Sequence, residues 1–91
     1  MEYSYPISFD WSTDEIINVV QFFEAIEKVY GNGITKKELM EKYRLFKQVV
    51  PSIGEEKSIF REFEQVSGYA SYKAVKMMKE TDDDQAKIKL S

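Results

Sequence analysis

The chain has 91 residues, with 13 Lys and Arg against 16 Asp and Glu for a formal charge of −3, and it contains neither Cys nor His. This length supports one domain with a single modest core. The missing Cys and His exclude disulfides, thiolate zinc sites, cysteine nucleophiles and imidazole bases. Carboxylate, lysine, tyrosine or hydroxyl chemistry remains, or no chemistry at all, and we expect no cofactor and no metal.

The N-terminal residues carry no sign of a targeting segment. Met1-Glu2-Tyr3 lacks a basic region, and no apolar run of about 7–15 residues follows it. The densest apolar stretch, 16–23, is interrupted by Asn18 and Gln21 and is far shorter than the ~20 residues of a membrane span. The sequence therefore predicts a soluble cytoplasmic protein with no membrane partner.

Residues 3–11 alternate between large apolar and polar or small side chains. The apolar members are Tyr3, Tyr5, Ile7, Phe9 and Trp11. A period of two is typical of an extended segment with one apolar face, and Pro6 suits an edge or a free arm. We predict an extended aromatic arm over 1–11. Since no other strand is predicted, the arm packs either on its own helical body or on a second copy.

Three helices are predicted from their capping boxes, each followed by apolar residues at spacings of three and four. The boxes pair Ser12 with Glu15, Thr35 with Glu38, and Ser52 with Glu55. The corresponding ends are Gly31-Asn32-Gly33, Pro51 and Ser67-Gly68. The first helix has the widest apolar stripe, so we expect it to be central.

A fourth helix is predicted over about 69–80. Its inward side is expected to carry Tyr69, Tyr72, Val75 and Met78, and its outward side Lys73, Lys76 and Lys79. Short links favour antiparallel packing of sequence neighbours. The predicted fold is all-α: a compact bundle of four short helices with the extended aromatic arm, forming a single domain over 1–80. Residues 81–91 are expected to be a frayed tail.

Several short motifs resemble the YktA-like uncharacterised protein family of Bacillus-type bacteria. They are Tyr5-Pro6, Trp11-Ser12-Thr13, Val50-Pro51-Ser52, Glu55-Glu56-Lys57, Arg61-Glu62-Phe63-Glu64 and Ser67-Gly68-Tyr69. The resemblance covers about 1–80. It departs at Ile53-Gly54, where a basic residue is expected, and in the acidic tail after Glu80. The resemblance implies an all-α fold and no established activity, so it assigns no functional residues.

Carboxylates are the main candidates for catalysis. Glu24 and Glu27 lie on the first helix and four further Glu on the third, but an acid–base pair needs one buried member with a raised pKa. We interpret these groups as helix caps and solvated faces. Asp82-Asp83-Asp84 lacks the spacing of a calcium loop. The prediction therefore leans away from an enzyme, and the alternative is carboxylate or tyrosine chemistry in a cleft between helices.

Nucleic-acid binding is a second alternative. The predicted third helix carries four Glu against Lys57 and Arg61, and this acidity disfavours a recognition helix. The fourth helix, with its three lysines, could bind nucleic acid only weakly.

The sequence favours a protein–protein interaction module without catalytic activity. The charge alternates along the chain, since one base and six acids give −5 over 1–30 and five bases and two acids give +3 over 31–50. Such alternation permits pairing within the bundle or docking on a charged partner. The predicted interaction residues are Tyr3, Tyr5 and Trp11 on the arm and Tyr69, Tyr72, Lys73 and Lys76 on the fourth helix. The partner is an unidentified protein or, through the arm, a second copy in a homodimer.

Overall fold

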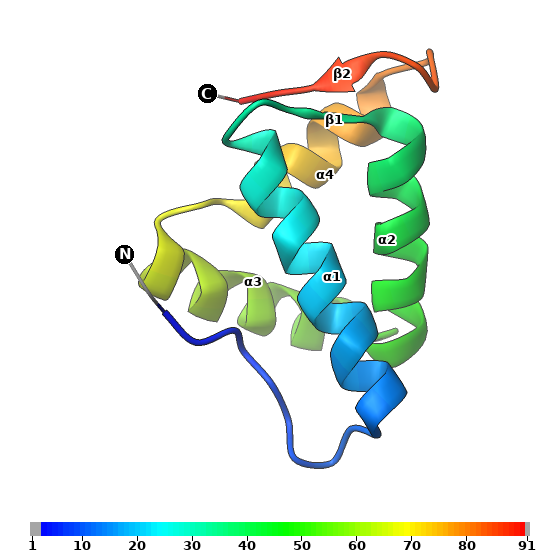
Figure 1. Cartoon of the computed structure of the whole chain (residues 1–91). Helices are drawn as coiled ribbons and strands as arrows, with labels where there is room; N and C mark the ends of the chain where they lie inside the picture. The colour runs from blue at the N-terminus through cyan, green and yellow to red at the C-terminus, as the bar shows by residue number, and fades with distance from the viewer. Residues whose placement is uncertain (1–2, 91) are drawn as a thin grey trace.

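The structure, a computed structural model, describes residues 3–90. The first two residues of the predicted arm and the last residue of the predicted tail lie outside this range. The elements follow the order α1 (Thr13–Val29), β1 (Ile34–Thr35), α2 (Lys36–Val49), α3 (Ile53–Ser67), α4 (Ser71–Glu80) and β2 (Lys87–Ile88) (Figure 1). The all-α prediction is confirmed, with the addition of one very small sheet. Among the described helices, none is both long and apolar enough to cross a membrane.

The first three helices begin where their capping boxes predict. The Ser12 hydroxyl accepts a hydrogen bond from the Glu15 amide at 3.2 Å, and the Glu15 carboxylate accepts from the Ser12 amide at 2.8 Å. The hydroxyls of Thr35 and Ser52 accept from the amides three residues later. These bonds satisfy amide groups that the first helical turn leaves without a partner.

The arrangement of the helices departs from a simple antiparallel bundle. α1 and α2 run side by side in opposite directions, as predicted, but α3 crosses the lower part of the molecule and α4 returns towards the upper part (Figure 1). Pro51 explains the change of direction, since it keeps Val50 (φ −124°, ψ 74°) out of helical geometry at the end of α2.

The core forms where α1 meets α2 and α3. Phe22 stacks on Phe46 with ring centroids 4.6 Å apart, and Phe23 stacks on Phe63 at 4.3 Å. All four rings are fully buried. α1 is therefore the central helix, as its wide apolar stripe predicts. Val66 follows Phe63 by three residues and so continues the apolar spacing of α3, but it is exposed.

The structure corrects the prediction of a frayed tail over 81–91. β2 pairs antiparallel with β1, Ile34 opposite Ile88, and the Leu90 amide donates to the Val29 carbonyl at 2.9 Å. Ile88 is fully buried. The segment is short and polar, which favours fraying, yet the burial of Ile88 and the backbone bonds hold it on the end of α1.

Candidate functional site

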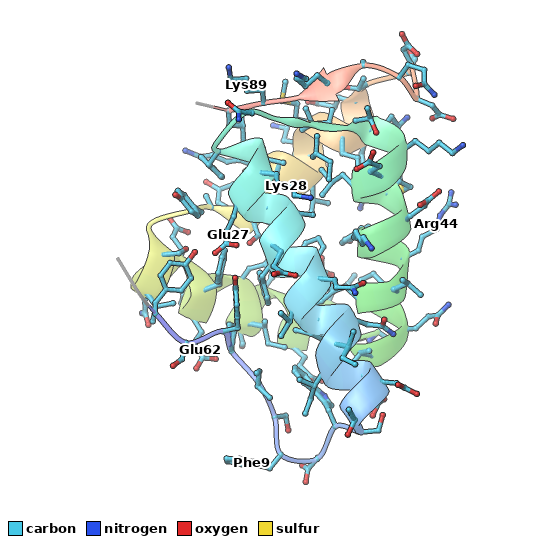
Figure 2. All side chains as sticks on the ribbon, in the orientation of Figure 1. Phe9, Glu27, Lys28, Arg44, Glu62 and Lys89 are labelled. Carbon is cyan, nitrogen blue, oxygen red and sulfur yellow. The ribbon has the colours of Figure 1, made fainter. Side chains whose placement is uncertain are left out.

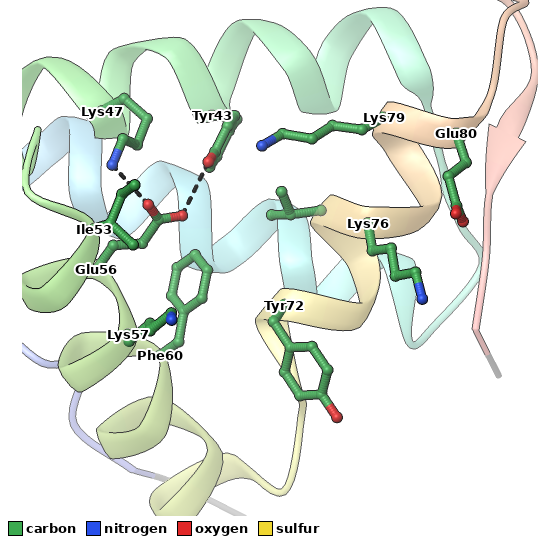
Figure 3. Close-up of a pocket in the computed structure, with 11 residues that line it drawn as sticks. Tyr43, Lys47, Ile53, Glu56, Lys57, Phe60, Tyr72, Lys76, Lys79 and Glu80 are labelled. Carbon is green, nitrogen blue, oxygen red and sulfur yellow. Dashed lines mark hydrogen bonds and ion pairs between the residues drawn. The ribbon is translucent and has the colours of Figure 1, made fainter.

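A groove of about 510 Å³ lies between α3 and α4, and α2 runs along a third side of it (Figure 3). Five apolar or aromatic side chains line it: Tyr43, Ile53, Phe60, Tyr72 and Val75. The charged lining residues are Lys47, Glu56, Lys57, Lys76, Lys79 and Glu80. The surface therefore combines apolar and aromatic side chains with charged ones that are mainly basic.

Glu56 is a buried carboxylate at the α2 side of the groove, with 8% of its surface exposed. One carboxylate oxygen accepts from the Tyr43 hydroxyl at 2.9 Å and the other pairs with the Lys47 ammonium at 2.6 Å (Figure 3). The interpretation of the α3 carboxylates as solvated is therefore wrong for Glu56. The signal was present in the sequence, because Glu56 precedes Ile59 and Phe60 by three and four residues and so shares their face of the helix.

Tyr43 is the protonated partner of this carboxylate. Burial, followed by the hydrogen bond to Glu56 and the charge of that carboxylate, raises the pKa of Tyr43 to about 12. The Lys79 ammonium lies 5.3 Å from the centre of the Tyr43 ring. The Tyr43 hydroxyl therefore stays protonated at neutral pH and cannot act as a base there. Both oxygens of the Glu56 carboxylate already have partners. The contacts join α2 to α3 and α4 and offer no free acid–base pair.

The rim of the groove is exposed and only partly neutralised. Ile53 is 68% exposed and Tyr72 is 55% exposed, although both are large apolar side chains. A neighbouring hollow of about 340 Å³ shares Lys57, Phe60 and Tyr72 with the groove and adds Arg61 and Glu64. The two hollows together carry five basic and three acidic side chains, a balance of +2 in a chain of net charge −3. We call this combined surface the α3–α4 groove.

The aromatic arm packs on its own helical body. The hydroxyls of Tyr3 and Tyr5 both donate to the Glu27 carboxylate, that of Tyr5 at 2.9 and 3.0 Å to its two oxygens. Both rings also lie against Phe63, Tyr5 stacked at 6.0 Å and Tyr3 edge-on at 5.8 Å. Burial and the contact with Glu27 raise the pKa of Tyr3 well above its usual range and that of Tyr5 to about 12.

The rest of the arm is uneven in its packing. Trp11 is half-buried against the core, whereas Phe9 is fully exposed and projects from the turn before α1 (Figure 2). The large side chains of the arm therefore do not all lie against the helical body, since Phe9 and Ile7 are exposed. Among the acidic side chains of residues 3–90, no three converge in a way that could hold a metal ion.

The interaction residues predicted on the fourth helix do not all lie on one surface. α4 begins at Ser71 and buries Ser71, Ala74, Val75 and Met78. Tyr72 therefore lies at the groove with Lys76 rather than inward, while Lys73 is exposed outside the groove lining. Tyr69 precedes the helix and stacks on Tyr30 at 4.8 Å. The predicted stripe follows a strict spacing of three, which drifts around a helix of about 3.6 residues per turn, whereas the buried residues follow spacings of three and four.

Comparisons with known proteins give a consistent result over nearly the whole chain. The model of an uncharacterised protein family, UPF0223, matches residues 2–87. A UPF0223 protein of Lysinibacillus sphaericus is 61% identical over 83 residues, which cover 91% of this chain and 87% of the relative. UPF0223 proteins of Bacillus cytotoxicus and Listeria monocytogenes are each 53% identical, over 91% and 97% of this chain and 93% and 98% of the relatives.

These matches confirm the resemblance to an uncharacterised family of Bacillus-type bacteria. They name no catalytic function. The chain belongs to the uncharacterised protein family UPF0223.

Proposed function

We propose that this protein is a small cytoplasmic protein-interaction module, and that the α3–α4 groove binds a segment of a partner protein. The observation that carries the proposal is the exposure of Ile53 and Tyr72 at the two sides of the groove (68% and 55%). Exposed apolar surface next to a hollow is typical of interaction sites. A partner that covered both side chains would gain the free energy of burying them.

The openness of the groove favours a protein segment over a small molecule. Binding pockets for small molecules cover most of the ligand surface. Here the exposed Ile53 and Tyr72 stand at the mouth, so a small ligand on the floor would leave them in water. A chain segment lying along the groove would cover the floor and the mouth together.

Two alternatives have weaker support. Tyrosine or carboxylate catalysis would use Tyr43 and Glu56, but the hydroxyl stays protonated at neutral pH and the carboxylate oxygens are already partnered. Nucleic acid would meet Glu64, which is exposed and lines the groove, and this carboxylate would repel a continuous run of phosphates.

A homodimer through the arm is a separate proposal, and the exposure of Phe9 supports it. The Tyr3 and Tyr5 contacts with Glu27 leave Phe9 and Ile7 as the part of the arm available to a second copy. The mass of the protein in concentrated solution tests this. A monomer mass would contradict the dimer, and a dimer mass that Phe9→Asp reduces to the monomer would support it.

The groove is tested by photo-crosslinking in the cell of origin, with the crosslinking amino acid placed at position 72. Position 44, on the outer side of α2, is the matched control site (Figure 2). A protein captured only from position 72 is then purified and its binding to the native chain is measured. We expect binding to be lost in Ile53→Asp and retained in Ile17→Asp, since Ile17 is a comparably exposed isoleucine on α1 (46%).

Folding of both variants is checked by circular dichroism and thermal unfolding. Equal loss of binding in the two folded variants would contradict a role for the groove, as would capture of no protein from position 72. Binding that survives Ile53→Asp would contradict it as well.

A further inference from the structure

We infer that the segment bound in the α3–α4 groove is an acidic amphipathic helix of the partner protein. This inference rests on the proposed function and adds the chemistry and the conformation of the occupant. Its apolar stripe would cover Ile53, Tyr72 and Val75, and its carboxylates would face the basic residues on both sides of the groove.

Charge complementarity is the first argument. Lys57, Arg61 and Lys76 line the groove and form no ion pair within residues 3–90. Lys47 is the exception among the lining cations, because Glu56 already neutralises it. The groove therefore presents unpaired positive charge on a protein whose net charge is negative. A basic segment would be repelled here, while an acidic one would be attracted and held in register.

The placement of these cations favours a helix. Lys57 and Arg61 lie four residues apart on α3, and Lys76 and Lys79 lie three apart on α4, so each side presents two cations about one helical turn (~5 Å) apart. A partner helix carries acidic side chains at the same spacing on both flanks of an apolar stripe. In an extended segment, successive side chains point to opposite faces. If its apolar side chains faced the groove, the acidic side chains between them would point away from the cations.

The lengths of the two walls limit the size of the occupant. α3 has 15 residues and α4 has 10, which correspond to about 22 Å and 15 Å. A helix of about 10–15 residues spans this distance with two or three apolar anchors. The Lys47–Glu56 pair and Ile53 bound one end of the groove (Figure 3).

A peptide helix also fits the mixed charge of the groove better than a nucleic acid does. Glu64 lines the groove beside Arg61, and Glu80 lies next to Lys79 in sequence. A helix can place its carboxylates opposite the cations and neutral side chains opposite these acids. A nucleic-acid backbone has one phosphate per nucleotide and cannot avoid them.

The test is to select, from a display library of random peptides, those that bind the purified full chain. The peptides are about 16 residues long, so that a helical peptide spans α3. Peptides that bind the native protein but not the folded Ile53→Asp variant are groove-dependent. We expect such peptides to carry apolar residues at i, i+3 or i+4, and i+7, with Asp and Glu at the flanking positions. Circular dichroism of the bound peptides should show helix.

The role of the cations is tested on the selected peptides by fluorescence anisotropy. Lys57→Glu with Lys76→Glu should weaken binding by at least about tenfold, and added salt should weaken binding to the native chain. Among residues 3–90, the ammonium groups of these two lysines form no hydrogen bond or ion pair with Tyr43 or Glu56. The matched control, Arg44→Glu with Lys89→Glu, makes the same change of charge away from the groove and should leave affinity within about twofold (Figure 2).

The outcomes separate the inference from the proposed function. Groove-dependent peptides that are neutral, basic or extended would overturn the inference and leave the interaction module standing. Unchanged affinity in Lys57→Glu with Lys76→Glu would do the same. Displacement of the peptides by single-stranded oligothymidylate would assign the groove to nucleic acid. If no peptide depended on Ile53, both the inference and the proposed use of the groove would fail.

Discussion

Ile34 and Ile88 lie opposite one another in the two-stranded antiparallel sheet, and both are buried against the core. This contact joins the segment after α1 to the end of the described chain. The Lys36 amide strengthens the connection by donating to the Ala86 carbonyl at 2.9 Å. The C-terminal segment is therefore a part of the folded body, and its removal has energetic consequences.

Ile88→Ala should lower the free energy of unfolding by about 2–4 kcal/mol, because a fully buried side chain leaves a cavity when it is shortened. Urea unfolding followed by circular dichroism measures the change. Leu90→Ala is the matched control, since this side chain is exposed and should cost little. Equal effects of the two substitutions would contradict the tail packing.

Gly33→Ala should destabilise the protein by about 1–3 kcal/mol, because Gly33 has a φ of +93° that other residues rarely adopt. An added Cβ would also lie 3.2 Å from the Ile88 carbonyl oxygen and 2.6 Å from Lys87 Cγ. Gly54→Ala should instead stabilise it by about 0.5–1 kcal/mol, because Gly54 is helical and its nearest neighbour would be 3.8 Å away. Thermal unfolding of the two variants gives the comparison. A loss of stability in Gly54→Ala comparable to that in Gly33→Ala would refute the assignment.

Glu27→Gln should loosen the arm, because two tyrosine hydroxyls donate to this carboxylate. We expect a loss of about 1–2 kcal/mol in unfolding free energy. The pKa of Tyr5, about 12 in the native chain, should fall towards 10 but stay above it, since burial is the larger cause of the shift. An NMR titration of the tyrosine rings measures this pKa. In Glu41→Gln, an exposed position on α2, the Tyr5 pKa should not change.

Tyr43 should make the stability of the protein fall in alkaline solution. Its pKa is raised from about 10 to about 12 by folding, so between these values the unfolded chain releases a proton that the folded chain retains. The stabilisation is complete below pH 10 and is lost as the pH rises through 12. Tyr43→Phe should cost about 1–2 kcal/mol at pH 7 through the lost bond to Glu56.

The measurement for Tyr43 is urea unfolding of the native chain and of Tyr43→Phe at a series of pH values. The difference in stability between the two proteins should shrink from pH 10 to 12, while the contributions of other groups cancel. A difference that stays constant over this range would show that Tyr43 ionises normally in the folded protein.

Local sequence signals predicted the helices well and the paths between them less well. Ser12, Thr35 and Ser52 mark helix starts because a capping hydroxyl acts within three residues. The direction of α3 was missed because it depends on how Phe60 and Phe63 fill the space beside α1. Local pattern carries no information about such distant contacts.

The candidate site was predicted in part. Tyr72 and Lys76 were named from the sequence and do line the groove, whereas Tyr3, Tyr5 and Tyr69 are engaged with the protein's own side chains. Ile53 was not among the predicted interaction residues, because a sequence does not distinguish an exposed isoleucine from a buried one. Exposure depends on which neighbours the fold supplies.

Composition and interactions within a few residues are enough to predict that the protein has no thiol or imidazole chemistry, that it is helical and where its first three helices begin. The burial of Glu56, the anchoring of the C-terminal segment by Ile88 and the apolar groove between α3 and α4 arise only when the chain is folded. Each of these depends on side chains far apart in the chain, and on the free energy gained when packing brings them together.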